Sequence, residues 1–177
     1  MIKLAVIGDP IGHTLSPLIQ GKMMERLGVE GEYTARHVRP EELAGFVASA
    51  LGEGLTGFNI TIPHKSGILP FLAGADPYAE SCGAVNTVKI AEGKFYGYNT
   101  DGDGIRSALR EMGADFPKAR VALLGAGGAA LSICRKALLS GAEAVEVFCR
   151  SPEKAAKMAG EGVEILPFSQ LGKPGLG

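Results

Sequence analysis

The chain has 177 residues, a net charge of −1 and a hydrophobic content of 46%. That hydrophobic content excludes intrinsic disorder, and the length allows one full domain or two small ones. Acidic and basic residues form no long block, which argues against nucleic acid or an anionic membrane surface as the partner. The composition therefore indicates a protein that acts on small molecules.

The sequence carries no signal for export, membrane insertion, disulfide formation or metal binding. The first apolar run is interrupted at Gly8-Asp9-Pro10, and the longest uncharged apolar stretch, 121–134, is shorter than the roughly 20 residues of a spanning helix. Cys82, Cys134 and Cys149 lack Cys-x-x-Cys spacing, and the three histidines are far apart. We therefore expect a cytoplasmic protein with reduced cysteines and no metal.

In chain order, the first half alternates strands and helices. Strands are expected over residues 3–8, 33–38, 57–62, 85–90 and 94–98, the last two forming a hairpin closed by 91–93. Helices are expected from 16 to 28, from 40 to 51, and as short segments around 65–72 and 77–82. In the first helix, Ser16 is the expected N-cap, and Leu18, Met23, Met24 and Leu27 form its apolar stripe.

The second half begins with a helix from Asp101, its expected cap, to Met112. It continues as a strand over 120–124, a helix over 129–139, a strand over 145–149, a helix over 152–159 and a strand over 163–166. This β-α-β-α-β order is half of a doubly wound sheet. Because residues 172–177 resemble a loop, we expect an incomplete domain with an exposed edge strand.

A glycine-rich turn in this second half predicts a dinucleotide site. Gly125, Ala126, Gly127, Gly128, Ala129 and Ala130 fit G-x-G-x-x-A between a strand and a helix. The first glycine permits a tight turn, the second lets a pyrophosphate approach the helix N-terminus, and the final alanine keeps helix and strand close.

The residues after the next strand indicate which dinucleotide binds. That strand ends at Arg150, with Ser151 and Lys154 close behind, whereas the acidic Glu146 lies inside the strand. A guanidinium suits the 2′-phosphate of NADP, and an acidic residue at this place would favour NAD. We predict NADP, with the alternative that Arg150 simply begins a solvated helix.

Polar side chains gather in several loops of the first half. Asn59 and Thr61 share one face of a strand end, and Lys65 follows where a helix is expected. Asn86 starts a strand, Asp101 starts a helix, and Thr14 and Ser16 lie in the loop after the first strand. Taken singly, Lys65 is an ordinary surface lysine, and Asp101 and Ser16 are helix caps. Taken together, these hydroxyls, amides, ammonium and carboxylate suit a small polyhydroxylated acid.

Five segments together resemble the shikimate dehydrogenase family. They are Gly-x-Pro-Ile…Ser-Pro (8–17), Asn-Ile-Thr-Ile-Pro-x-Lys (59–65), Gly-Ala-Val-Asn-Thr (83–87), Asn-Thr-Asp-Gly-x-Gly (99–104) and Gly-Ala-Gly-Gly-Ala-Ala (125–130). The resemblance implies an α/β fold with an N-terminal substrate-binding domain of mainly parallel sheet at 1–101. Residues 102–177 would be a linking helix and a partial Rossmann-type NADP-binding domain.

The resemblance also implies a function, the reversible NADPH-dependent reduction of 3-dehydroshikimate to shikimate in the chorismate pathway of aromatic amino-acid biosynthesis. Lys65 and Asp101 would be the catalytic proton-transfer pair. The substrate carboxylate would meet Thr14 and Ser16. The ring hydroxyls would meet Asn59, Thr61, Lys65, Asn86 and Asp101. Such proteins are often monomers or homodimers.

Three departures from the family pattern keep alternatives open. Thr14 replaces the usual serine, Cys149 replaces the asparagine of an Asn-Arg-Thr motif, and the chain has about two-thirds of the family's length. We therefore expect this chain to bind substrate weakly and to turn over poorly. The alternatives are an NAD-preferring quinate/shikimate dehydrogenase, a non-catalytic shikimate-binding module, and a methylenetetrahydrofolate dehydrogenase on the same plan.

Overall fold

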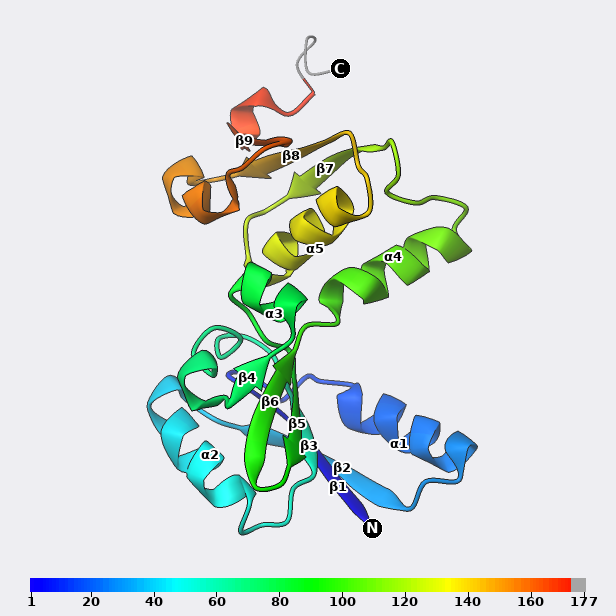
Figure 1. Cartoon of the computed structure of the whole chain (residues 1–177), viewed down its shortest axis with the longest axis vertical. Helices are drawn as coiled ribbons and strands as arrows, with labels where there is room; N and C mark the ends of the chain where they lie inside the picture. The colour runs from blue at the N-terminus through cyan, green and yellow to red at the C-terminus, as the bar shows by residue number, and fades with distance from the viewer. Residues whose placement is uncertain (173–177) are drawn as a thin grey trace. The chain divides into compact units, whose positions relative to one another are not determined.

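The chain divides into two units, Met1–Asn99 and a second one that begins at Thr100 (Figure 1). The computed structural model describes residues 1–172, apart from the side chain of Lys154. The loop expected at 172–177 therefore falls, beyond Gly172, outside the described residues. The predicted domain boundary followed Asp101, two residues after the observed one, so Lys65 belongs to the first unit and Asp101 to the second.

A six-stranded sheet of order β2-β1-β3-β5-β6-β4 forms the first unit. Its strands are β1 (Ile2–Gly8), β2 (Gly31–His37), β3 (Gly57–Ile60), β4 (Gly74–Ala75), β5 (Thr87–Ala91) and β6 (Lys94–Tyr98). β1 is parallel to β2 and β3, β4 is parallel to β6, and β5 is antiparallel to β3 and β6. The prediction of a mainly parallel sheet is confirmed, and so is the β5–β6 hairpin.

The core of the first unit lies between this sheet and α2 (Leu43–Ala50), which follows the 3₁₀ turn η1 (Pro40–Glu42). Phe58 of β3 contacts two other rings edge-on, Phe46 at 5.1 Å and Phe95 at 6.2 Å between ring centroids. Burying one such side chain contributes about 1.5–3 kcal/mol to folding. The alternation of buried Phe58 and Ile60 with half-buried Asn59 sets which face of β3 carries polar groups.

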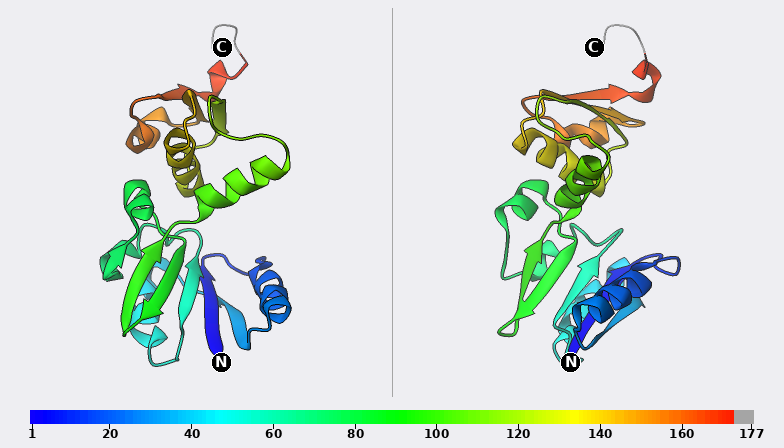
Figure 2. Two further views of the ribbon diagram at one scale, coloured as in Figure 1. Left: turned by 45° about the vertical axis from the view of Figure 1, so that its right-hand side comes forward. Right: turned by 90° about the vertical axis from the view of Figure 1, so that its right-hand side faces the viewer.

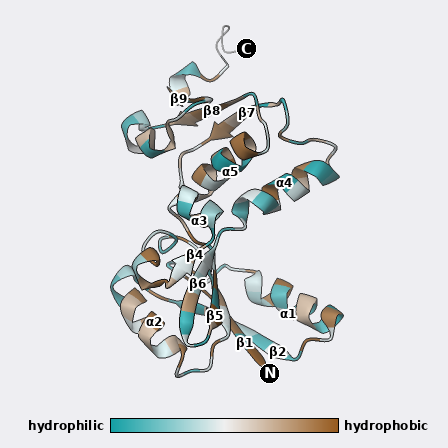
Figure 3. Ribbon diagram, viewed as in Figure 1, coloured by the Kyte–Doolittle hydropathy of each residue, from teal (hydrophilic) through white to brown (hydrophobic). Residues whose placement is uncertain are grey.

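Helix α1 (Ser16–Leu27) forms over the predicted residues, and none of them is buried. Leu18 is 59% exposed, Met23 49% and Leu27 73%, while Met24 is half-buried near Gly31. The apolar stripe of this helix is therefore not buried. The apolar side chains of α1 colour it partly brown in Figure 3. An apolar stripe indicates a helix face that is suited to burial, but it does not predict which segment covers that face.

The segment after β3 also differs from its prediction. β3 ends at Ile60, Ile62 is 71% exposed, and residues 62–68 form turns, with a short 3₁₀ helix η2 (Leu69–Phe71) after them. A helix through Lys65 would need its carbonyl for an intrahelical bond. That carbonyl instead accepts from Val85 N at 2.8 Å, so a long-range contact replaces the predicted helix.

The second unit is a parallel three-stranded sheet of order β7-β8-β9 (Figure 2). Its elements are α4 (Asp101–Glu111), β7 (Arg120–Leu124), α5 (Gly128–Leu139), β8 (Ala144–Cys149), η3 (Pro152–Met158), β9 (Val163–Pro167) and η4 (Phe168–Gln170). The predicted element order is confirmed, except that residues 152–158 form a 3₁₀ helix. Val145, Val147 and Cys134 are fully buried in its core, and the brown strands of Figure 3 mark this apolar sheet.

Gly57 is a position where this packing can be tested. A Cβ there would lie 2.7 Å from the carbonyl oxygen of Val88, so Gly57→Ala should destabilise the first unit by about 1–3 kcal/mol. Gly45, exposed in α2 with open space around its Cβ position, is the matched control, and Gly45→Ala should stabilise by about 0.5–1 kcal/mol.

Urea unfolding followed by tyrosine fluorescence measures both variants. All four tyrosines lie in the first unit and the chain has no tryptophan, so the signal reports this unit. Equal free energies of unfolding for Gly57→Ala and the parent chain would contradict the described β3–β5 packing.

Candidate substrate and cofactor site

A cavity of about 330 Å³ opens at the carboxyl ends of β1 and β3. Three predicted substrate residues, Thr14, Ser16 and Thr61, line it, together with Val6, Ile11 and His13. Ligands of open α/β sheets bind at this edge. The structure thus brings the loop 8–17 and the end of β3 together around one space within the first unit.

The hydroxyls of Thr14 and Ser16 form a pair at this cavity. Thr14 Oγ1 donates to Ser16 Oγ at 3.0 Å and accepts from the Ser16 backbone N–H at 3.2 Å. Helix α1 has Leu15 at its N-cap position and no side-chain capping bond, so the expectation that Ser16 caps it is wrong. The Ser16 hydroxyl keeps its own proton to donate, which suits an anionic ligand group.

Asn59, which pairs with the cavity residue Val6 in the sheet, makes three side-chain hydrogen bonds to neighbouring groups. Its Oδ1 accepts from the Tyr33 hydroxyl at 2.7 Å. Its Nδ2 donates to the Asn86 carbonyl at 3.3 Å and to Thr87 Oγ1 at 3.0 Å. Burial raises the pKa of the Tyr33 phenol to about 12, so this hydroxyl stays protonated and serves as a donor.

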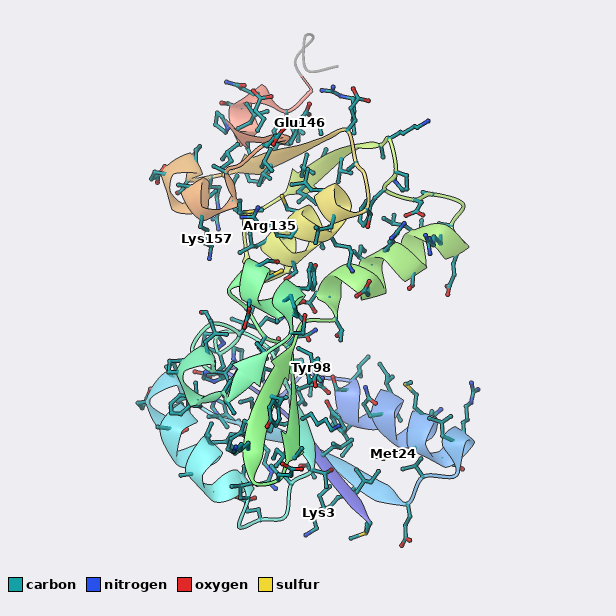
Figure 4. The ribbon with its side chains drawn as sticks, viewed as in Figure 1. Lys3, Met24, Tyr98, Arg135, Glu146 and Lys157 are labelled. Carbon is teal, nitrogen blue, oxygen red and sulfur yellow. The ribbon has the colours of Figure 1, made fainter. Side chains whose placement is uncertain are left out.

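Backbone hydrogen bonds bring Lys65 and Asn86 into the same region of the first unit. Val85 N donates to Lys65 O at 2.8 Å, and Ile60 N donates to Asn86 O at 2.8 Å. The Lys65 side chain is half-buried. Asn86 N in turn donates to the carbonyl of Tyr98, which Figure 4 labels at the end of β6.

Asp101 begins α4 in the second unit, two residues after Asn99. Asn99 is buried and fixed, because its N–H donates to Asp76 Oδ2 at 3.2 Å and its Nδ2 donates to Ala84 O at 2.9 Å. The N-cap position of α4 is Thr100, without a side-chain capping bond. The expectation that Asp101 caps this helix is therefore wrong.

The glycine turn in the second unit has the local geometry that a pyrophosphate needs. Gly125 has φ +115°, a conformation that strongly favours glycine, and its N–H donates to Phe148 O at 2.8 Å. Gly127 occupies the N-cap position of α5, and a Cβ built on it would meet no atom within 4 Å. The first intrahelical donor bond runs from Leu131 N to Gly127 O, so the N–H groups of the first turn face outward as in other anion sites.

The residues after β8 are those predicted to meet the 2′-phosphate of NADP. Arg150 is exposed, and no carboxylate among the described residues lies within ion-pair distance of it. Glu146, labelled in Figure 4, accepts a hydrogen bond from Arg120 at 2.9 Å. Ser151 is half-buried, and the side chain of Lys154 lies outside the described residues.

Sequence reasoning missed Tyr33 and Thr87 as members of the site. Thr87 could have been found, because it directly follows Asn86 in the 83–87 motif, whereas Tyr33 is 26 residues from Asn59 with no local signal.

Among residues 1–172, no helix is long and apolar enough to cross a membrane. Within the same residues, His, Cys, Asp and Glu side chains form no group of three that could hold a metal ion.

Fold and site together define a class, a two-unit α/β protein with a dinucleotide-binding-type second unit. Residues 6–88 match the model of the shikimate dehydrogenase substrate binding domain. The chain is 44% identical over 173 residues to the shikimate dehydrogenase (NADP(+)) of Citrifermentans bemidjiense, a match that covers 97% of this chain and 60% of that protein.

Two solved structures are similar as well. Shikimate dehydrogenase from Aquifex aeolicus has a TM-score of 0.88 and 35% identity, covering 94% of this chain and 62% of that one. Shikimate 5-dehydrogenase from Thermus thermophilus in complex with NADP(H) and shikimate has a TM-score of 0.87 and 36% identity. The match covers 96% of this chain and 64% of that one. The chain is thus a homologue of the shikimate dehydrogenases that spans about three-fifths of their length.

Proposed function

We propose that this chain carries the shikimate-binding unit and part of the NADP-binding unit of a shikimate dehydrogenase. The observation that supports it best is the cavity lined by Thr14, Ser16 and Thr61, because it lies in the segment that matches the family's substrate binding domain. A monomer or homodimer in the cytoplasm belongs to the same proposal and rests on the family resemblance.

The substrate carboxylate is assigned to the hydroxyl pair of Thr14 and Ser16. The Ser16 proton is available for donation because Thr14 already donates to Ser16 Oγ. Thr61 on the same cavity and Asn86, whose carbonyl accepts from Ile60 N, are assigned to ring hydroxyls. The methyl group of Thr14, where the family has serine, narrows this end of the cavity.

Proton transfer is assigned to Lys65 and Asp101. In the reduction, a proton passes from the Lys65 ammonium to the carbonyl oxygen of 3-dehydroshikimate, and the ammonium stabilises the charge that develops on this oxygen. The Asp101 carboxylate is the partner of the Lys65 ammonium in this proton transfer. Bound NADPH supplies the hydride. In the reverse direction the same two side chains remove the proton from the shikimate hydroxyl.

The cofactor is assigned to the α5 N-terminus and the residues after β8. The open approach at Gly125 and Gly127 supports a pyrophosphate there, and the exposed guanidinium of Arg150 supports a 2′-phosphate. Ser151 and Lys154 complete the proposed contacts with the adenosine ribose.

Lys65→Ala tests the proton-transfer assignment in the catalytically active protein. We expect kcat to fall by about 10²–10⁴-fold, because the proton donor is lost, while the Kd of shikimate stays within a few-fold. Lys94→Ala, at an exposed position that begins β6, is the control and should leave kcat unchanged. Near-normal turnover in Lys65→Ala would show that another group moves the proton.

Arg150→Ala tests the cofactor assignment. We expect the KM of NADPH to rise about 10–100-fold, because a charge-assisted contact with the 2′-phosphate is lost, while the KM of NADH changes little. Oxidation of NADPH by 3-dehydroshikimate, compared with oxidation of NADH, measures both KM values. Equal effects on the two cofactors would make Arg150 a solvated residue at the start of η3.

A further inference from the structure

We propose that a one-directional chain of hydrogen bonds through Asn59 and Thr87 orients the carboxamide of Asn86, so that Asn86 meets the substrate as a hydrogen-bond donor. In this inference Tyr33, Asn59 and Thr87 are positioning residues. It rests on the proposed function, because the ligand that Asn86 meets is the proposed one, shikimate or its 3-keto form.

The direction of the chain is set by a group that cannot be reversed. The backbone carbonyl of Asn86 is only an acceptor, and it lies 3.3 Å from the amide of Asn59. The Asn59 side chain must therefore turn its Nδ2 toward this carbonyl and its Oδ1 away from it. The opposite orientation would place two oxygen acceptors against each other.

Tyr33 reinforces the same orientation from the other side. Its hydroxyl lies 2.7 Å from Asn59 Oδ1, and the raised pKa of the half-buried phenol keeps its proton available for donation. The neighbours on both sides of the Asn59 carboxamide therefore favour the same orientation of this amide. All three hydrogen bonds of this amide lie within the first unit and none of them depends on a ligand.

Thr87 connects the Asn59 carboxamide to the Asn86 carboxamide by hydrogen bonds. Its Oγ1 accepts a hydrogen bond from Asn59 Nδ2 at 3.0 Å and lies 3.0 Å from Asn86 Oδ1. Asn59 Nδ2 occupies only a lone pair of this hydroxyl, so its one proton is available for Asn86 Oδ1, the acceptor that lies against it. Thr87 therefore donates to Asn86 Oδ1, and Asn86 Nδ2 lies on the side of its amide away from Thr87.

Two consequences follow for recognition. Asn86 offers N–H groups, so its match on the substrate is an oxygen lone pair of a ring hydroxyl or of the ketone. Asn59 acts through Asn86, because both hydrogens of its Nδ2 are donated within the first unit. The sequence-based expectation gave Asn59 a direct contact with a ring hydroxyl, and the hydrogen-bond chain gives it a positioning role.

Calorimetric titration of the chain with shikimate tests the inference in a double-mutant cycle. Thr87→Val keeps the shape but removes the hydroxyl, and should raise the Kd about five- to tenfold. Thr87→Ser keeps the hydroxyl and should restore the Kd to within twofold of the parent chain. In an Asn86→Ala background, Thr87→Val should change the Kd less than twofold, because nothing remains to be oriented.

An equal loss from Thr87→Val with and without Asn86 would overturn the inference, because it would make the role of Thr87 merely structural. Tyrosine fluorescence melts confirm that each variant is folded. Hydrogen exchange of the Asn59 Nδ2 protons, followed by NMR without any ligand, is a second readout. Exchange should accelerate about tenfold or more in Thr87→Val, and unchanged exchange would refute the hydrogen-bond chain.

The two readouts separate the inference from the proposed function. Absence of shikimate binding by the folded parent chain would overturn the proposed substrate. The exchange measurement would then still decide whether Thr87 and Asn59 form the described chain.

Discussion

The pairing of β3 with β1 on one side and β5 on the other is the constraint on which the candidate site depends. Parallel pairing places the carboxyl ends of β1 and β3 together, and antiparallel pairing places the start of β5 beside them. Residues 8–17, 59–65 and 85–87 therefore meet, although they are far apart in the sequence. A slip of one residue in β3 would turn Asn59 and Thr61 to the opposite face and bring Phe58 to the site.

The same pairing explains why polar side chains are tolerated next to an apolar core. Phe58 and Ile60 fill the α2 side of β3, whereas Asn59 on the other side finds Tyr33 and Thr87 as partners. An unpaired amide in such a place would cost about 1–3 kcal/mol, and the hydrogen bonds remove this cost. They also make the site rigid before any ligand binds, which favours selective recognition.

Much of the fold followed from local sequence signals, because buried strands are apolar runs and the glycine turn at 125–130 has a distinctive pattern. The sequence did not predict features decided by distant partners. Lys65 lies in a turn because its carbonyl bonds Val85, and the apolar side of α1 is exposed although its pattern suits burial. Ser16 and Asp101 each lie one position inside their helices, where neither caps the helix end. The role of Tyr33 depends on a contact across 26 residues.

The most direct test of this account is an NMR titration of the isotopically labelled chain with shikimate. Saturable shifts are expected for the backbone amide signals of Thr14, Ser16 and Thr61, which line the cavity, and of Lys65, the proposed proton donor. Folded protein whose first-unit signals do not move, or whose shifts are confined to the second unit, would contradict it.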